Sequence, residues 1–192
     1  ANDTTVTVNP QTSERTLTID TSAYDSTTGQ LASRNASTTV TSSSGLQLQA
    51  LNVTYNAQGS ITQTSLSESQ ANGTQLTIVR DGTGNTLSTT TAQTYDDGSS
   101  VSTTSYPSGV STRLATNPDG SLFSREVTIP KGIGSETSLY NGAGALQSIT
   151  TRQGDDDGNT LVSVSTLAGT TTTAYDPDNN LISENFTPAG AV

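Results

Sequence analysis

The sequence contains no cysteine, methionine, tryptophan or histidine. Without cysteine there is no disulfide framework and no thiolate chemistry, and the compartment cannot be inferred from cysteine usage. Catalysis would then depend on carboxylate pairs, on serine with lysine, or on a metal ion. Glu126 and Glu136 are the two carboxylates that a glycosidase interpretation would pair. Because glutamates on solvated strand faces are the plainer interpretation, we predict that the protein is not an enzyme.

Apolar and charged residues are also scarce. Hydrophobic residues fill 29% of the 192 positions, against roughly 45–50% in ordinary globular chains. This is enough to cover one face of a sheet but not to fill a thick core. No apolar run approaches the ~20 residues of a membrane span, so we expect no membrane insertion. The net charge of −10, with Lys131 as the one lysine, argues against nucleic acid as a partner.

Short segments in which apolar and polar residues alternate run along most of the chain. Apolar side chains alternate with Thr, Ser or Gln at Val6 and Val8, Leu17 and Ile19, Leu76 and Ile78, and Val162 and Val164. This period of two indicates strands with one apolar and one solvated face. No segment has helical apolar spacing free of glycine. We therefore predict an all-β antiparallel meander of repeated short hairpins, forming an elongated or spiralling sheet.

The alternation slips by one residue between Leu48 and Leu51. A slip of this kind predicts a β-bulge, which we place around Ala50.

One turn motif punctuates these segments: an aromatic residue, an acidic or amide residue, spacers, glycine and an aliphatic residue. It occurs as Tyr24-Asp25 with Gly29 and Leu31, as Tyr55-Asn56 with Gly59 and Ile61, as Tyr140-Asn141 with Gly144 and Leu146, and as Tyr175-Asp176 with Asn180 and Ile182. In the last copy we expect Asn180 to replace glycine at the left-handed position. The turn glycines from Gly59 to Gly120 recur about sixty residues later, which predicts an internal repeat. We divide the chain into an N-terminal strand over 1–17 and a hairpin repeat domain over 18–192.

The Tyr-Asp-x-x-x-Gly spacing at Tyr24-Asp25 and the Tyr175-Asp176-Pro177 turn resemble the Rhs or YD-repeat family. The turns Pro107-Ser108-Gly109 and Pro130-Lys131-Gly132 add to this likeness, which covers residues 18–190. In that family the repeats build long spiralling antiparallel sheets, often closed into hollow shells around a toxin or exposed on cell surfaces. The resemblance implies an architecture and a surface location rather than catalysis. The repeats here are too few to close a large shell.

Clustered carboxylates and amides in two turns are candidate Ca²⁺ ligands. They are Asp155, Asp156, Asp157 and Asn159 in one turn, and Asp176, Asp178 and Asn180 in the other. The triple aspartate is the better candidate, because adjacent carboxylates repel one another unless a cation intervenes. The competing interpretation is structural, since Asp and Asn side chains bond the backbone of turns. Apart from Ca²⁺ we expect no cofactor.

Sequons of the Asn-x-Ser/Thr type are candidate glycosylation sites, at Asn2, Asn35, Asn52, Asn72 and Asn185. We interpret the tyrosines as packing across hairpins rather than as a sugar-binding platform. Threonine-rich runs such as Thr89-Thr90-Thr91 raise an ice-binding interpretation, but the turn spacing varies too much for a regular array. Threonine on the solvated face of a sheet is ordinary β propensity.

These features favour a structural protein that self-assembles as a subunit of an extracellular filament, sheath or surface layer. An open meander leaves unpaired backbone groups at its edges, and a free strand can pair with such an edge. We predict that Thr4, Thr5, Val6, Thr7 and Val8 form an arm that pairs with a neighbouring subunit. The chain begins Ala1-Asn2-Asp3, as after removal of a signal peptide, which suggests a secreted or cell-surface protein.

Two other functions remain open at this point. The chain is also consistent with a stalk or binding module of an adhesin, cut from a larger surface protein, for which glycans are candidate ligands. The third interpretation is a fragment of a toxin-enclosing shell of the Rhs type.

Overall fold

The computed structural model describes residues 2–70 and 72–190, and all their regular secondary structure is β-strand. Strands follow one another in chain order, and each ladder between neighbours is antiparallel. The predicted all-β antiparallel hairpin meander is therefore confirmed. No helix of the described residues has the length and apolar character to cross a membrane. The chain divides into two units, residues 1–93 and 94–192. The boundary that we expected between residues 17 and 18 falls inside a strand.

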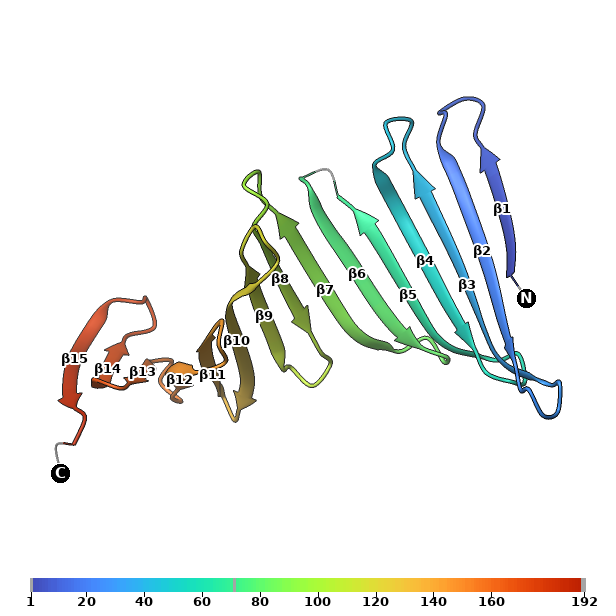
Figure 1. The fold of residues 1–192 in the computed structure, drawn as a ribbon. Coiled ribbons are helices and arrows are strands. Elements are labelled where there is room, and N and C mark those ends of the chain that lie inside the picture. The colour runs from blue at the N-terminus through green and yellow to red at the C-terminus, as the bar shows by residue number, and fades with distance from the viewer. Residues whose placement is uncertain (1, 71, 191–192) are drawn as a thin grey trace. The chain divides into compact units, whose positions relative to one another are not determined.

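The first unit is a sheet of long strands, which Figure 1 shows side by side from β1 at the N-terminal edge. Its strands are β1 (Asn2–Val8), β2 (Arg15–Tyr24), β3 (Leu31–Thr41), β4 (Gln47–Tyr55), β5 (Ile61–Ser69), β6 (Thr74–Asp81) and β7 (Thr86–Thr94).

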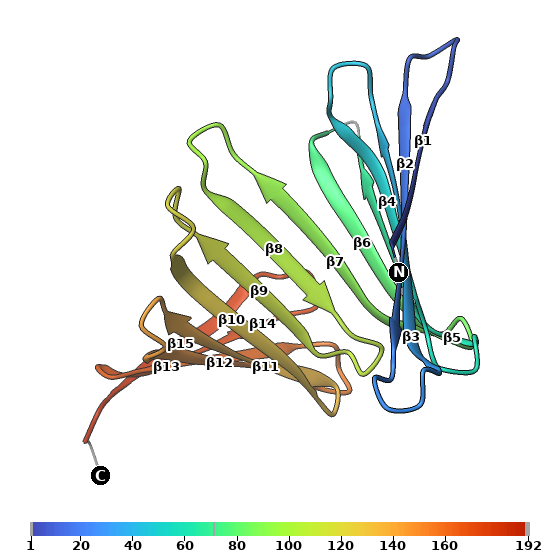
Figure 2. The same ribbon diagram turned by 45° about the vertical axis from the view of Figure 1, so that its right-hand side comes forward.

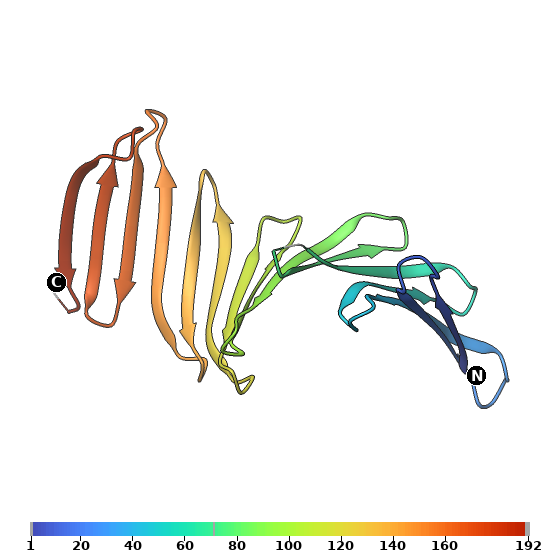
Figure 3. The same cartoon turned by 90° about the horizontal axis from the view of Figure 1, so that it is seen from above.

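The second unit repeats this arrangement with its own strands, seen from above in Figure 3 as the yellow-green to red ribbons. They are β8 (Ser100–Ser105), β9 (Ser111–Thr116), β10 (Leu122–Lys131), β11 (Gly134–Asn141), β12 (Leu146–Gly154), β13 (Thr160–Thr166), β14 (Gly169–Tyr175) and β15 (Leu181–Pro188).

Each unit consists of a single layer of strands, as the view in Figure 2 also shows. Among the described residues no hydrophobic side chain is fully buried, and Gly169 is the one residue classed as buried. Both faces of the sheet are therefore partly solvated. This agrees with the low apolar content, since 29% hydrophobic residues cannot fill a second layer.

Cross-strand pairs of polar side chains contribute where a core is absent. Hydroxyls of directly opposed residues hydrogen-bond, as between Thr128 and Thr137 at 2.8 Å. The guanidinium of Arg125 lies 4.6 Å from the ring centroid of Tyr140, its partner on β11. Such pairs each contribute a few tenths to about 1 kcal/mol to a sheet. The sheet is therefore stabilised by many such cross-strand pairs rather than by any single strong one.

Most hairpin loops share one geometry. The first loop residue donates its N–H to the carbonyl four residues later, and the residue three positions on, usually glycine, donates back to the first. This is a type I turn closed by a left-handed residue. The loops of this kind open at Ser42, Asn56, Gln70, Asp81, Tyr95, Tyr106, Asn117, Asn141, Asp155 and Asp176. In the last loop the positive φ of 62° belongs to Asn179. The expectation that Asn180 takes this position was therefore wrong by one residue.

The predicted bulge in β4 lies slightly earlier than expected. Between Val40 and Thr41 of β3 the partner on β4 steps from Gln49 to Gln47, so Leu48 is the extra residue. Our placement around Ala50 was wrong, because Ala50 stays in register opposite Thr39. The apolar pattern reveals that a strand slips but not which residue is unpaired.

Neighbouring loops pack against one another within each unit. A Cβ added to Gly82 would lie 2.0 Å from the Ile61 carbonyl oxygen, and one added to Gly142 would lie 2.1 Å from that of Leu122. Both glycines follow the first residue of their loop. Their backbones therefore pack directly on the hairpin two strands earlier.

Candidate functional site: sheet edges and aspartate turns

The segment Thr4 to Val8 lies in β1, the edge strand of the first unit. It pairs over its whole length with β2 of the same chain, from Asn2 opposite Thr21 to Val8 opposite Arg15. In the part of the chain that the structure describes, β2 is the one strand paired with β1. The segment is thus an edge strand with one side open, and not a detached arm.

The outward-facing backbone groups of β1 can be identified from its first loop. Asn9 donates its N–H to the Glu14 carbonyl at 2.9 Å, so the backbone of Asn9 faces β2. Because orientation alternates along an antiparallel strand, Thr7 and Thr5 also face β2. The N–H and C=O groups of Val8, Val6 and Thr4 consequently point away from the sheet.

The side chains of this edge are also accessible. Val6 is 50% and Val8 is 58% exposed. Val6 lies opposite Leu17, and Thr4 lies opposite Ile19, so these residues share one face. Thr5 and Thr7 occupy the other face. The open edge of β1 therefore offers backbone donors and acceptors beside a valine-lined surface.

The strand β15 forms the corresponding edge of the second unit. Ala189 donates its N–H to the Ala168 carbonyl at 3.0 Å, so Ala189 and Thr187 face β14. Glu184, Phe186 and Pro188 then direct their backbones outward. Phe186 is 54% exposed. Since proline has no N–H, this edge lacks one of the donors that β1 has.

The aspartates predicted as Ca²⁺ ligands hold the loops together. The Oδ1 atom of Asp155 accepts N–H groups from Asp157 at 3.0 Å and Asn159 at 2.8 Å. Its Oδ2 atom accepts the Asn159 side-chain amide at 2.9 Å. Asp176 makes the same three bonds with Asp178 and Asn180. Neutral Asn141 makes the two backbone bonds in the same way, which indicates that the geometry needs an acceptor rather than a charge.

These bonds stabilise the ionised carboxylates. Hydrogen bonds from Asn159 lower the pKa of Asp155, and hydrogen bonds from Asn180 lower the pKa of Asp176. The pKa of Asp81 falls furthest, to about 2, chiefly because its carboxylate accepts bonds from the side chains of Thr83 and Asn85. The cause in each loop is hydrogen bonding to the charged form.

No group of three or more His, Cys, Asp or Glu side chains in residues 2–70 and 72–190 is arranged to hold a metal ion. Asp155 already directs both carboxylate oxygens at its own loop, so a cation there would compete with these donors. Ca²⁺ binding at Asp155, Asp156, Asp157 and Asn159, or at Asp176, Asp178 and Asn180, stays a prediction.

The carboxylates of the glycosidase interpretation lie apart. Glu126 pairs with Arg113 at 3.0 Å, and Glu136 pairs with Lys131 at 2.5 Å. Glu126 lies opposite Leu139, whereas Glu136 lies opposite Ile129, an odd number of residues further along β10. Because side chains alternate along a strand, the two carboxylates point to opposite faces of the sheet. The structure does not bring them together.

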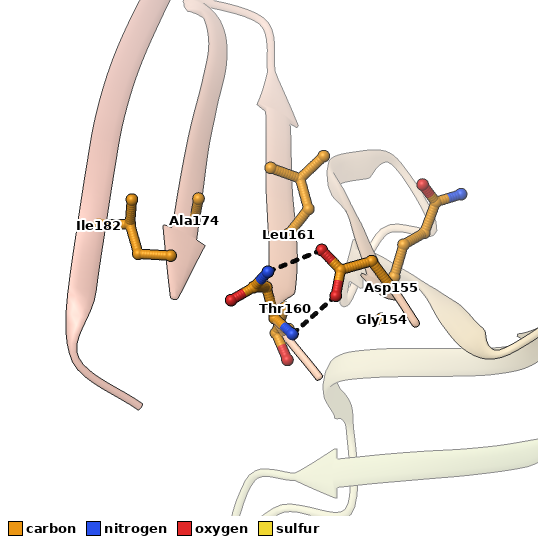
Figure 4. A pocket seen from close by; sticks show the side chains of 8 residues that line it. Gly154, Asp155, Thr160, Leu161, Ala174 and Ile182 are labelled. Carbon is orange, nitrogen blue, oxygen red and sulfur yellow. Dashed lines mark hydrogen bonds between the residues drawn. The ribbon is translucent and has the colours of Figure 1, made fainter. Parts of the chain in front are cut away.

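A shallow hollow of 340 Å³ lies in the second unit, beside the loop of Asp155. Figure 4 shows Leu161, Ala174 and Ile182 along one side of it, from three neighbouring strands, with Asp155 at the other. Sequence reasoning did not find this hollow, because Ile182 reaches it as the extra residue of a bulge opposite Ala174 and Tyr175.

The candidate glycosylation sites are all exposed, at Asn2, Asn35, Asn52, Asn72 and Asn185. Asn72 lies in a loop, whereas Asn35 and Asn52 lie well inside β3 and β4. Their use stays a prediction.

Comparison with protein-family models matches no family, and no curated protein matches the chain. The resemblance to the YD-repeat family therefore stays a prediction that depends on the turn residues.

Proposed function

We propose that the protein is a non-catalytic structural subunit that assembles with further copies of itself into a surface filament, sheath or layer. In a monomer the edge strands leave backbone N–H and C=O groups without a partner strand, and association through these edges pairs them. The location outside the cell belongs to the same proposal and depends on the resemblance to the YD-repeat family.

The observation that carries the proposal is the amount of surface left exposed. The chain exposes 12124 Å², whereas a compact monomer of 19.7 kDa exposes about 8,600 Å² by the usual area–mass scaling. The excess of about 3,500 Å² per chain is larger than the roughly 1,000–2,500 Å² that each partner of an obligate interface buries. Association would remove part of this surface from water and pair the free backbone groups of the edges.

Backbone pairing is the mode of association that suits this composition. It needs few large apolar side chains, because the main-chain hydrogen bonds supply much of the affinity. The open edge of β1 offers such groups over its full length. Within residues 2–70 and 72–190 the sheet also has no second layer that could shield its edges from a partner.

The test is the mass of the purified chain over a series of concentrations, measured by light scattering behind size exclusion, with electron micrographs of the same samples. The proposal predicts assemblies larger than one chain that dissociate on dilution and appear as fibres or sheets. A chain that is folded by circular dichroism yet monomeric at every concentration would contradict it. That outcome would favour the adhesin stalk.

A further inference from the structure

The two open edges differ in how well they are protected against pairing. Natural sheets protect their edges with proline, lysine, inward charges or bulges. The β15 edge has an outward Glu184, ends at Pro188 and carries a bulge at Ile182. The strand β1 contains no proline, no lysine and no shift of register along its ladder, and the backbone of its one charged residue, Asp3, faces β2. The β1 edge therefore lacks the features that prevent pairing at β15, and it can accept a partner strand.

We infer that β1 pairs antiparallel with β1 of a second copy, with Val6 on the two-fold axis. This inference rests on the proposed function and names the surface that it uses. The outward groups of Thr4, Val6 and Val8 come into register because Val6 faces Val6 of the second copy, and Thr4 faces Val8. Each opposed pair exchanges two backbone hydrogen bonds, as outward residues of antiparallel strands do.

The side chains are compatible with this register on both faces. On one face valine meets valine and threonine, so the apolar surfaces coincide. On the other face Thr5 meets Thr7, which repeats the hydroxyl pairs that Thr128 and Thr137 form within the chain. Asp3 meets Asn9, so no like charges are opposed across the axis. The β1 edge is therefore complementary to itself, as a two-fold interface requires.

Other arrangements match less well. A register centred on Thr5 places Val8 against Asn2, and so separates the apolar residues that set register in a sheet. Pairing of β1 with β15 in the register that joins Val6 to Phe186 puts Val8 against Glu184. It also joins Thr4 to Pro188, which has no N–H to donate. Two copies thus associate first through their β1 edges, and larger assemblies form through other surfaces of the dimer.

Charge swapping at the axis tests this arrangement. In Val6→Lys or Val6→Glu alone, two like charges oppose each other, and we expect the dimer to weaken roughly tenfold or more. An equimolar mixture of the two variants should restore dimers that contain one copy of each. Leu46→Lys, at an exposed loop position, is the matched control and should dimerise like the unmodified chain. Failure of the mixture to recover while the control still dimerises would overturn the inference.

Cysteine cross-linking gives an independent readout, because the chain has no cysteine of its own. Thr5→Cys mixed with Thr7→Cys should form a disulfide-linked dimer under mild oxidation, whereas Thr5→Cys alone should not. Cross-linking of Thr5→Cys with itself would replace the Val6-centred register by the Thr5-centred one. Assembly without either cross-link would overturn β1 pairing and leave the proposed function intact. A monomeric unmodified chain would end both.

Discussion

In several loops of this protein one carboxylate or amide side chain accepts hydrogen bonds from two backbone N–H groups and so fixes the loop. Asp81, Asp155 and Asp176 each accept backbone N–H groups from the residues two and four positions later, and also a side-chain amide. Because these bonds favour the ionised form, the pKa of each carboxyl is lowered. A lowered pKa in the folded state stabilises the fold above the ordinary pKa. The contribution is lost as the pH falls through the folded value.

Replacing Asp81 by Asn should therefore make the protein less sensitive to acid. The folded pKa of Asp81 is about 2 and its ordinary value is 3.8, so its contribution disappears between these values. Asn keeps the Oδ1 acceptor, as Asn141 does in its own loop, but its amide nitrogen cannot accept the Asn85 side chain as Oδ2 does, so we expect lower stability near neutral pH and a smaller further loss in acid. Denaturant midpoints at neutral pH and at about pH 2.5 measure the difference. An acid loss as steep in Asp81→Asn as in the unmodified chain would contradict this explanation.

The loop between β14 and β15 offers a second test at the residue scale. Asn179 has a φ of 62°, a conformation that glycine adopts without strain, so Asn179→Gly should keep or raise stability by ~0.5 kcal/mol. Asn180 donates its side-chain amide to Asp176, and Asn180→Gly should lower stability. Thermal melts of both variants measure this order, and the reverse order would restore our original assignment of Asn180.

At the scale of elements, loops of neighbouring hairpins share contacts that the turn motif does not reveal. Gly144 has a φ of 82° and open space around its Cβ position, so it is needed for its backbone angle alone. Gly142, in the same loop, is blocked by the Leu122 carbonyl. Both glycines occupy one short loop, yet their reasons for being glycine differ.

Gly142→Ala should consequently cost more stability than Gly144→Ala. Alanine at position 144 bears the left-handed backbone, at about 1–2 kcal/mol. Alanine at position 142 bears no left-handed backbone, but it must push two hairpins apart, because its Cβ would lie 2.1 Å from the Leu122 oxygen. Chemical denaturation of the two variants gives the comparison. Equal losses of unfolding free energy, or a larger loss for Gly144→Ala, would show that the loops do not pack as described.

Hairpins were predictable from the sequence because both of their signals are local. Alternation at Leu76 and Ile78 marked a strand, and Gly59 and Gly144 marked left-handed loop positions, with positive φ in the structure. Bulges were less accessible, since Leu48 and Ala50 look alike in an apolar pattern and partner register decides between them. Ser13, with a φ of 57°, carried no signal at all.

For the whole molecule, the low apolar content predicted the absence of a thick core, and the structure has a single layer of strands in each unit. The candidate site was less predictable. The segment Thr4 to Val8 was marked by its alternation, but its pairing with β2 and the direction of its free N–H groups required the ladder. The alternation of apolar and polar residues predicts which face each side chain occupies. The direction of each backbone N–H group depends on the observed hydrogen bonds between β1 and β2.

A sheet without a core should also unfold with a small change in heat capacity. Unfolding raises heat capacity mainly by exposing apolar surface, and ordinary proteins gain about 12–15 cal/mol/K per residue. Because the described side chains are already partly solvated, we expect a value below this range for the dissociated chain. Differential scanning calorimetry at low concentration measures it. A value within the ordinary range would indicate buried apolar surface that a single layer does not provide.

The most direct test of assembly through the β1 edge is amide hydrogen exchange of β1, followed by NMR as a function of concentration. The N–H groups of Thr5 and Thr7 face β2 and serve as internal controls. Our account predicts that the Val6 amide is protected at high concentration and exchanges freely after dilution, while Thr5 and Thr7 stay protected throughout. A Val6 amide that exchanges freely at every concentration, in a folded chain, would contradict the account.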